Sequence, residues 1–95
     1  MELEGFEWDD RKASANLLKH RISFLEASSV FYDPFVVIEP DLDHCIEEMR
    51  EKAIGLSMKD RLLLVVYVEL IGRIRIISAR KATLKERRKY EFQFG

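Results

Sequence analysis

Basic side chains are concentrated near the end of this chain, in the stretch from Gly72 to Glu91. The stretch holds eight basic and two acidic residues, a net charge of +6, whereas the whole chain of 95 residues carries −1. The remainder therefore carries −7. A basic region of this density indicates a polyanionic partner, and the acidic remainder argues against simple nonspecific adhesion.

Arginines are the residues of this chain best suited to chemistry on phosphate, because a planar guanidinium can donate paired hydrogen bonds to phosphate oxygens. Those expected to converge on neighbouring strands of one sheet are candidates for phosphate binding and transition-state stabilisation: Arg50, Arg73, Arg75 and Arg80. The competing interpretation of Arg73 and Arg75 is a solvated strand face. We favour the functional interpretation.

Three other residues are candidates for proton transfer: Lys19, His20 and Tyr90. An imidazole titrates near neutral pH, whereas a lysine or tyrosine needs a lowered pKa to act as a base. Lys19 and His20 also fit the end of a helix, where cations are favoured, and the sequence favours that interpretation. Tyr90 fits packing near Phe94 equally well.

The remaining basic residues of the stretch follow the strand or lie on a helix opened by Thr83-Leu84-Lys85-Glu86, the pattern of a capping box. Spacing of three and four residues places Lys85, Arg88 and Lys89 on one face of this helix. Residues expected to hold a nucleic acid or an acidic partner, rather than to do chemistry, are Lys81, Lys85, Arg87, Arg88 and Lys89.

Two short helices are predicted before the sheet. The first covers Arg11 to His20, with Ala13, Leu17 and His20 on one face and Leu18 at its edge. The second opens with another capping-box pattern, Ser23-Phe24-Leu25-Glu26, and runs to about Tyr32, just before a proline.

Strands make up most of the rest. Beyond a short one at Gly5 to Trp8, they are expected at Phe35 to Glu39, Glu51 to Met58, Arg61 to Glu69, and from Gly72 to a turn through Ser78 to Ala82. The apolar run Leu62 to Val68 predicts a central strand buried on both faces, and Gly55 indicates a bulge or a close approach. The last four strands form an antiparallel meander with the helices on one face, an α+β fold.

Composition sets further limits. Residues 1–95 are expected to form one domain, and the single Cys45 excludes an intramolecular disulfide framework and fits a reducing compartment. The N-terminus is acidic and polar, unlike a signal peptide, and no apolar run is long enough to span a bilayer. Asp43, His44 and Cys45 invite a metal site, but adjacent residues point in different directions, so we favour a solvated acidic loop.

Two groups of residues form motifs that together cover nearly the whole chain. The first contains Phe6-Glu7-Trp8-Asp9, Lys12, Asn16, Lys19-His20, Ile22-Ser23-Phe24 and Glu26-Ala27. The second runs from Arg73 to Arg80 and continues with Ala82-Thr83 and Glu86-Arg87-Arg88-Lys89-Tyr90-Glu91. Between them lie Val30-Phe31, Asp33-Pro34, Arg50 and Ala53-Ile54-Gly55. In this order the pattern resembles the BrnT family of type II toxins, partners of BrnA antitoxins.

The resemblance implies a RelE-like α+β fold, with two N-terminal helices and a C-terminal helix packed on a curled, mainly antiparallel four-stranded sheet. It implies an endoribonuclease that uses no metal and no cofactor and that inhibits translation and growth. It also implies a cytoplasmic protein neutralised in a heterotetramer by a BrnA-like antitoxin encoded next to it. Operator DNA would be bound only through the antitoxin, and no membrane is involved.

The sequence departs from the family pattern at two turns. Arg21 stands where the family usually has glycine, which predicts a different turn between the helices. Leu70-Ile71 stands where relatives carry polar residues, so the pair is either a contact surface or a tolerated exposure. Two alternatives to an active toxin stay open: a binding module without turnover, which needs the same charge, and a family member that has lost activity.

Overall fold

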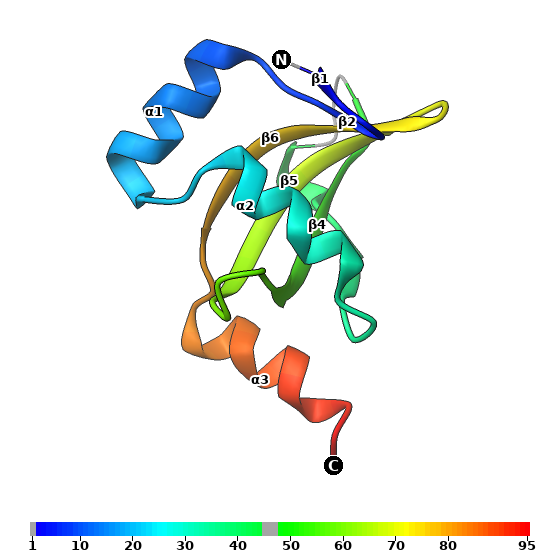
Figure 1. The fold of residues 1–95 in the computed structure, drawn as a ribbon. Helices are drawn as coiled ribbons and strands as arrows, with labels where there is room; N and C mark the ends of the chain where they lie inside the picture. The colour runs from blue at the N-terminus through cyan, green and yellow to red at the C-terminus, as the bar shows by residue number, and fades with distance from the viewer. Residues whose placement is uncertain (1, 45–47) are drawn as a thin grey trace.

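The computed structural model describes residues 2–44 and 48–95 (Figure 1). Its sheet runs in the order β1-β2-β6-β5-β4-β3. The strands are β1 (Glu2–Leu3), β2 (Phe6–Glu7), β3 (Val37–Pro40), β4 (Arg50–Leu56), β5 (Leu62–Leu70) and β6 (Arg73–Lys81). The helices are α1 (Asp10–His20), α2 (Phe24–Ser29) and α3 (Leu84–Phe92), with short 3-10 turns η1 (Val30–Tyr32) and η2 (Leu42–His44).

The sheet is mainly antiparallel, which confirms the predicted α+β class. Only β2 and β6 pair in parallel among the strands of the described chain. The sheet has six strands instead of the predicted four, because β1 and β2 add to the free edge of β6.

Helices cover both faces of the sheet. α1 and α2 lie on one face, where Phe24, Leu63 and Val65 belong to the larger buried cluster. On the other face Tyr90 of α3 packs with Ile54, Leu62 and Leu64. Burial of β5 on both faces is therefore confirmed, and the prediction that all helices share one face is wrong. Successive strand residues point to opposite faces, so an uninterrupted apolar strand needs a layer on each side.

The buried residue of α1 is Asn16, not Leu17, whose exposed fraction is 48%. The Asn16 amide donates to the carbonyl of Ala79 over 2.8 Å and accepts from the Ala79 amide over 3.0 Å. It also donates to the carbonyl of Ile22 over 2.9 Å. The side chain thus replaces a neighbouring strand at the edge of β6, which continues to Lys81 where a turn was predicted.

The capping-box pattern at Ser23 is only half formed. The Ser23 hydroxyl accepts from the Glu26 amide over 3.0 Å, as a cap should. The Glu26 carboxylate, however, turns into the core, where it accepts from Ser57 over 2.7 Å and pairs with Arg61. The helix ends at Ser29 and continues to Tyr32 only as the turn η1.

The structure shows the backbone at the two turns that depart from the family pattern and at the glycine within β4. Arg21 ends α1 in the left-handed conformation, with φ of 61°, so it takes up the backbone that glycine favours. Gly55 is a close approach, because a Cβ there would lie 2.9 Å from Cγ1 of Val30. Ile71 is fully exposed at the projecting tip of the β5–β6 hairpin, which stands out in Figure 1.

Two further expectations concern the acidic loop at Asp43, His44 and Cys45 and the absence of a membrane span. Cys45 lies outside the described residues, and η2 covers the part of the loop just before it. Of the helices described here, none has the length and apolar character required to cross a membrane.

Candidate active site

The strand register brings basic residues of several strands into one line. Arg50 pairs with Val68 between β4 and β5, and Val68 pairs with Arg75 between β5 and β6. Arg75 in turn pairs with Glu7 of β2. Directly paired residues share one face of a sheet, and neighbouring strands lie about 5 Å apart. We call this line of four residues, Arg50, Val68, Arg75 and Glu7, the arginine row.

The arginine row lies on the face that α3 packs on. Two residues further along β4 toward α3, Lys52 aligns with Val66 and Ser78. Two residues further still along β5, Leu64 aligns with Arg80 and belongs to the cluster around Tyr90. Val66 pairs with Ser78 but Tyr67 pairs with Ile76, a register shift that brings Arg75 and Arg80 to the same face of β6. The predicted phosphate-binding arginines therefore all extend from this side.

Glu7 joins the two arginines at the start of β6. The Arg75 Nε donates to Glu7 Oε2 over 2.9 Å, and Arg73 Nη1 lies 3.6 Å from Glu7 Oε1. The hydrogen bond from Arg75 holds the pKa of the Glu7 carboxyl below its usual value, with added attraction from Arg73. The three side chains are partly open to solvent, at 24% for Glu7, 35% for Arg73 and 44% for Arg75. Both arginines can therefore meet a phosphate without a change of fold.

Arg50 reaches this face from the other side of β5. Its Nε lies 3.3 Å from Oε1 of Glu48, a residue only two positions earlier in the chain. Its side chain is 29% exposed. Arg50 and Arg75 thus flank Val68, two strand spacings apart, and each has an acidic side chain as its partner.

Arg80 has a structural task that the sequence did not indicate. Its two terminal nitrogens donate to the two carboxylate oxygens of Glu86 over 2.8 and 2.9 Å. Glu86 also accepts from the backbone amide of Thr83, which completes the predicted capping box. Arg80 therefore fastens the first turn of α3 to the end of β6. Loss of this side chain would disturb α3 as well as any bound phosphate.

Replacing Glu86 with glutamine should destabilise the fold by about 1–2 kcal/mol at pH 7, since it removes the charge of the ion pair and one of the two oxygens that accept from Arg80. The hydrogen bonds from Arg80 lower the pKa of Glu86 from 4.5 to about 2. A lowered folded-state pKa stabilises the protein above pH 4.5, and this contribution is lost as pH falls toward about 2.

Urea unfolding at pH 7 and pH 3 measures both effects, with Glu91→Gln on the exposed side of α3 as the control. The difference between wild type and Glu86→Gln should shrink at pH 3. A difference that stays constant would contradict the assigned ion pair.

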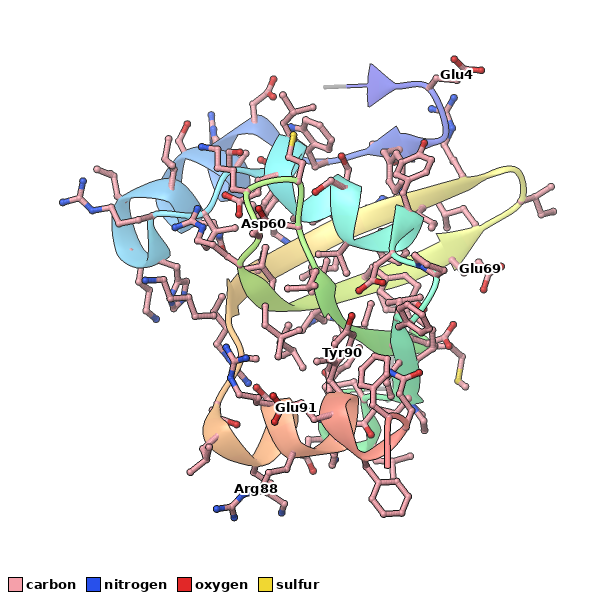
Figure 2. All side chains as sticks on the ribbon, turned by 60° about the horizontal axis from the view of Figure 1, so that its bottom comes forward. Glu4, Asp60, Glu69, Arg88, Tyr90 and Glu91 are labelled. Atoms are coloured by element: carbon pink, nitrogen blue, oxygen red, sulfur yellow. The ribbon has the colours of Figure 1, made fainter. Side chains whose placement is uncertain are left out.

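Cations of α3 gather beside β3. A hollow of about 490 Å³ is lined by Val37, Glu39, Lys85, Arg88, Lys89 and Phe92, so the predicted shared helix face is confirmed. Lys89 donates to Glu39 over 3.0 Å, and Arg88 extends away from the sheet (Figure 2). Lys81 and Arg87 line a separate hollow next to Asp60 and Arg61.

Tyr90 is buried, and its position fits packing near Phe94 rather than proton transfer at the surface. It is 6% exposed, and its hydroxyl donates to Oδ2 of Asp33 over 2.6 Å. The ring packs on Phe94 with centroids 5.7 Å apart. Burial, with the Asp33 carboxylate, raises the pKa of Tyr90 to about 12. Figure 2 shows Tyr90 directed from α3 toward the sheet, a position that fastens the helix.

Lys19 and His20 lie in the last turn of α1, where the helix C-terminus favours cations. Ala13 packs α1 on the cluster of the α2 face, and Asn16 binds the edge of β6. The arginine row extends from the opposite face. The structure therefore does not gather these two proton-transfer candidates with the arginines.

Two residues of this face were missed in the sequence: Glu7 and Lys52. A signal for Glu7 was present, because it alternates with the aromatic residues Phe6 and Trp8. Phe6 is buried and Trp8 packs against the same cluster, so Glu7 must point to the other face. Among the described residues, no group of three histidine, cysteine or acidic side chains could hold a metal ion.

Fold and face together define a small α+β protein with an arginine-lined sheet suited to binding phosphate. The family model described as "Ribonuclease toxin, BrnT, of type II toxin-antitoxin system" matches residues 8–86. The chain therefore belongs to the BrnT family of ribonuclease toxins, as its motifs predicted.

A solved structure supports the fold. The 1.1 Å crystal structure of the Brucella abortus ribonuclease toxin, BrnT, is similar with a TM-score of 0.64 and 21% identity. The match covers 82% of this chain and 95% of that one. No curated protein matches the sequence.

Proposed function

We propose that the chain is a metal-independent endoribonuclease that inhibits translation and growth, and that its site is the sheet face around the arginine row. The observation that carries this proposal is the register that places Arg50, Arg75 and Glu7 in one line. Arg73 shares Glu7 with Arg75 at the end of that line.

Cleavage of RNA without a metal uses the 2′-hydroxyl of the substrate as nucleophile. The enzyme must help to remove the proton of that hydroxyl, stabilise charge on the phosphorane, and allow the 5′ oxygen to leave. Guanidinium groups on both sides of Val68 suit the second task, because they donate to phosphate oxygens where negative charge develops. Arg50, Arg73 and Arg75 extend from this face, which supports charge stabilisation by the side chains of the protein itself.

The test is cleavage of a short single-stranded RNA by the purified protein in excess EDTA. We expect products that end in a 2′,3′-cyclic phosphate, and no cleavage of the same oligonucleotide with 2′-deoxyribose throughout. If the RNA is bound but not cut, adding ribosomes with messenger RNA separates a ribosome-dependent enzyme from a binding module. Cleavage that requires a divalent ion would contradict the proposed mechanism.

We further propose a BrnA-like antitoxin, encoded next to this gene, as the partner in a cytoplasmic heterotetramer that binds operator DNA through the antitoxin. The charge of the chain supports this, since an acidic surface of the antitoxin would complement the basic face in the inhibited complex. We expect the antitoxin to bury Arg73, Arg75 and Arg80. A complex in which these three arginines are as exposed as in the free protein would show that inhibition acts elsewhere.

A further inference from the structure

Glu7 occupies an unusual position for a surface carboxylate. It ends the arginine row on β2 and lies within ion-pair distance of both Arg73 and Arg75. Its side chain is partly exposed on the same face as the two guanidinium groups. A phosphate bound by these arginines would therefore lie next to a carboxylate oxygen.

The fold does not depend on this carboxylate. β2 is attached through its backbone pairing with β6 and through Phe6, which is 5% exposed and packs with Phe31. A solvent-exposed ion pair adds little to stability. Because the fold does not explain a carboxylate between two arginines, we look for a role of Glu7 toward the substrate.

We propose that Glu7 is the general base that takes the proton from the 2′-hydroxyl of the bound RNA. The inference rests on the proposed ribonuclease function and adds the residue that the sequence candidates do not supply. Incoming phosphate oxygens replace Glu7 as acceptors for Arg73 and Arg75, which releases the carboxylate next to the nucleophile.

In this step the 2′ proton moves to a Glu7 oxygen while the bond between the 2′ oxygen and phosphorus forms. The bond between phosphorus and the 5′ oxygen breaks, and the 5′ oxygen takes a proton from water. The products are a 2′,3′-cyclic phosphate and a 5′-hydroxyl, and Glu7 returns its proton to the solvent. No oxidant, metal or further reactant is needed.

The ionisation of Glu7 fits this role in the free protein. Hydrogen bonding from Arg75 keeps the pKa of Glu7 low, so the carboxylate is ready to accept a proton at neutral pH. When a phosphate takes over the arginines, that stabilisation of the charged form weakens and the carboxylate becomes a stronger base.

The experiment compares wild type, Glu7→Gln, Glu7→Asp and Glu48→Gln. Glu48 is the matched control, because it also pairs with an arginine of this face but lies outside the arginine row. Single-turnover cleavage of a short RNA is followed from pH 4 to pH 9, and binding is measured with the uncleavable 2′-deoxy oligonucleotide. Thermal melting reports the fold of each variant.

We expect Glu7→Gln to cleave about 100-fold more slowly or worse, to bind the deoxy oligonucleotide at least as tightly, and to lose the acid limb of the pH–rate profile. Glu7→Asp should keep that limb at a reduced rate, and Glu48→Gln should cleave within a few-fold of wild type.

Three outcomes would overturn the assignment. Glu7→Gln could cleave like wild type with the same pH profile. It could instead cleave more slowly and bind more weakly to the same degree, with residual cleavage that keeps the acid limb, which is the result for a residue that only positions the arginines. If wild type binds RNA but never cuts it, even on ribosomes, the proposed function itself fails and the base assignment falls with it.

Discussion

Replacing Arg75 with alanine should lower the rate of RNA cleavage by about 100-fold or more while the protein stays folded. Arg75 lies between Val68 and Glu7 in the arginine row, and its side chain is 44% exposed. In the proposed site a guanidinium there meets the phosphate in the transition state, whereas its ion pair with Glu7 is a solvent-exposed contact that adds little to stability. Single-turnover cleavage and thermal melting measure the two effects separately.

Two further variants make this test specific. Arg75→Lys keeps the charge but not the paired donors, so a loss of at least about ten-fold would show that geometry matters as well as charge. Arg11→Ala removes an exposed cation of α1, a helix that packs on the opposite face of the sheet through Ala13, and should leave cleavage within a few-fold of wild type. The prediction is wrong if Arg75→Ala melts and cleaves as wild type does.

Arg80→Ala is a weaker test, although the sequence motif suggests it first. Arg80 holds Glu86 with two hydrogen bonds, and Glu86 caps the first turn of α3. A loss of cleavage in this variant would not distinguish phosphate contact from a displaced helix. Glu86→Gln is its necessary companion, since it loosens the same anchor and keeps the arginine.

The sequence predicted that Arg50 and the arginines of β6 converge on one sheet, but not which other residues share their line. Alternation in β6 shows that Arg73 and Arg75 share a face, because that property is local. Which residue of another strand lies opposite depends on register, and packing of the whole sheet decides it. Glu7 was missed for this reason, since its two-residue strand pairs in parallel with a segment 68 positions away.

The assignment of helices to faces failed for a related reason. Apolar residues at successive positions of β5 required a layer on each side of the sheet, and this was visible in the sequence. Which helix supplies which layer is set by the connections. α3 follows β6 directly after Lys81 and packs through Tyr90 on the face opposite to α2.

Two matching capping-box patterns gave different results. Thr83 and Glu86 form the complete box, whereas Ser23 caps α2 without help from Glu26. The Glu86 carboxylate accepts from Arg80 and from the Thr83 amide at the same time, so the ion pair and the cap support each other. At Glu26 the residues Arg61 and Ser57 lie deeper in the fold and draw the carboxylate away from the helix end. Tertiary partners thus overrode a local signal.

Replacing Arg61 with alanine should lower the urea midpoint of unfolding far more than Lys59→Ala does, because it leaves a buried carboxylate without its charged partner. Glu26 is 1% exposed, and Arg61 supplies its charged partner through Nε over 2.9 Å and through a second contact from Nη2. The hydrogen bond from Arg61 is the main reason that the pKa of Glu26 is low. Without it, Ser57 is the side-chain donor that the buried carboxylate retains among the described residues. Urea unfolding at pH 7 measures the loss.

The pH dependence of this variant identifies the cause. In wild type the lowered pKa of Glu26 stabilises the fold above the ordinary carboxyl pKa, and this stabilisation is lost in acid. In Arg61→Ala the unpaired carboxylate should titrate at a raised pKa, so protonation removes its penalty and the gap to wild type narrows as pH falls. Lys59→Ala removes an exposed cation of the same hairpin and should change stability by about 0.5 kcal/mol or less. Equal unfolding midpoints for Arg61→Ala and Lys59→Ala would mean that Glu26 finds water or another donor, and that α2 does not need this ion pair to stay on the β4–β5 hairpin.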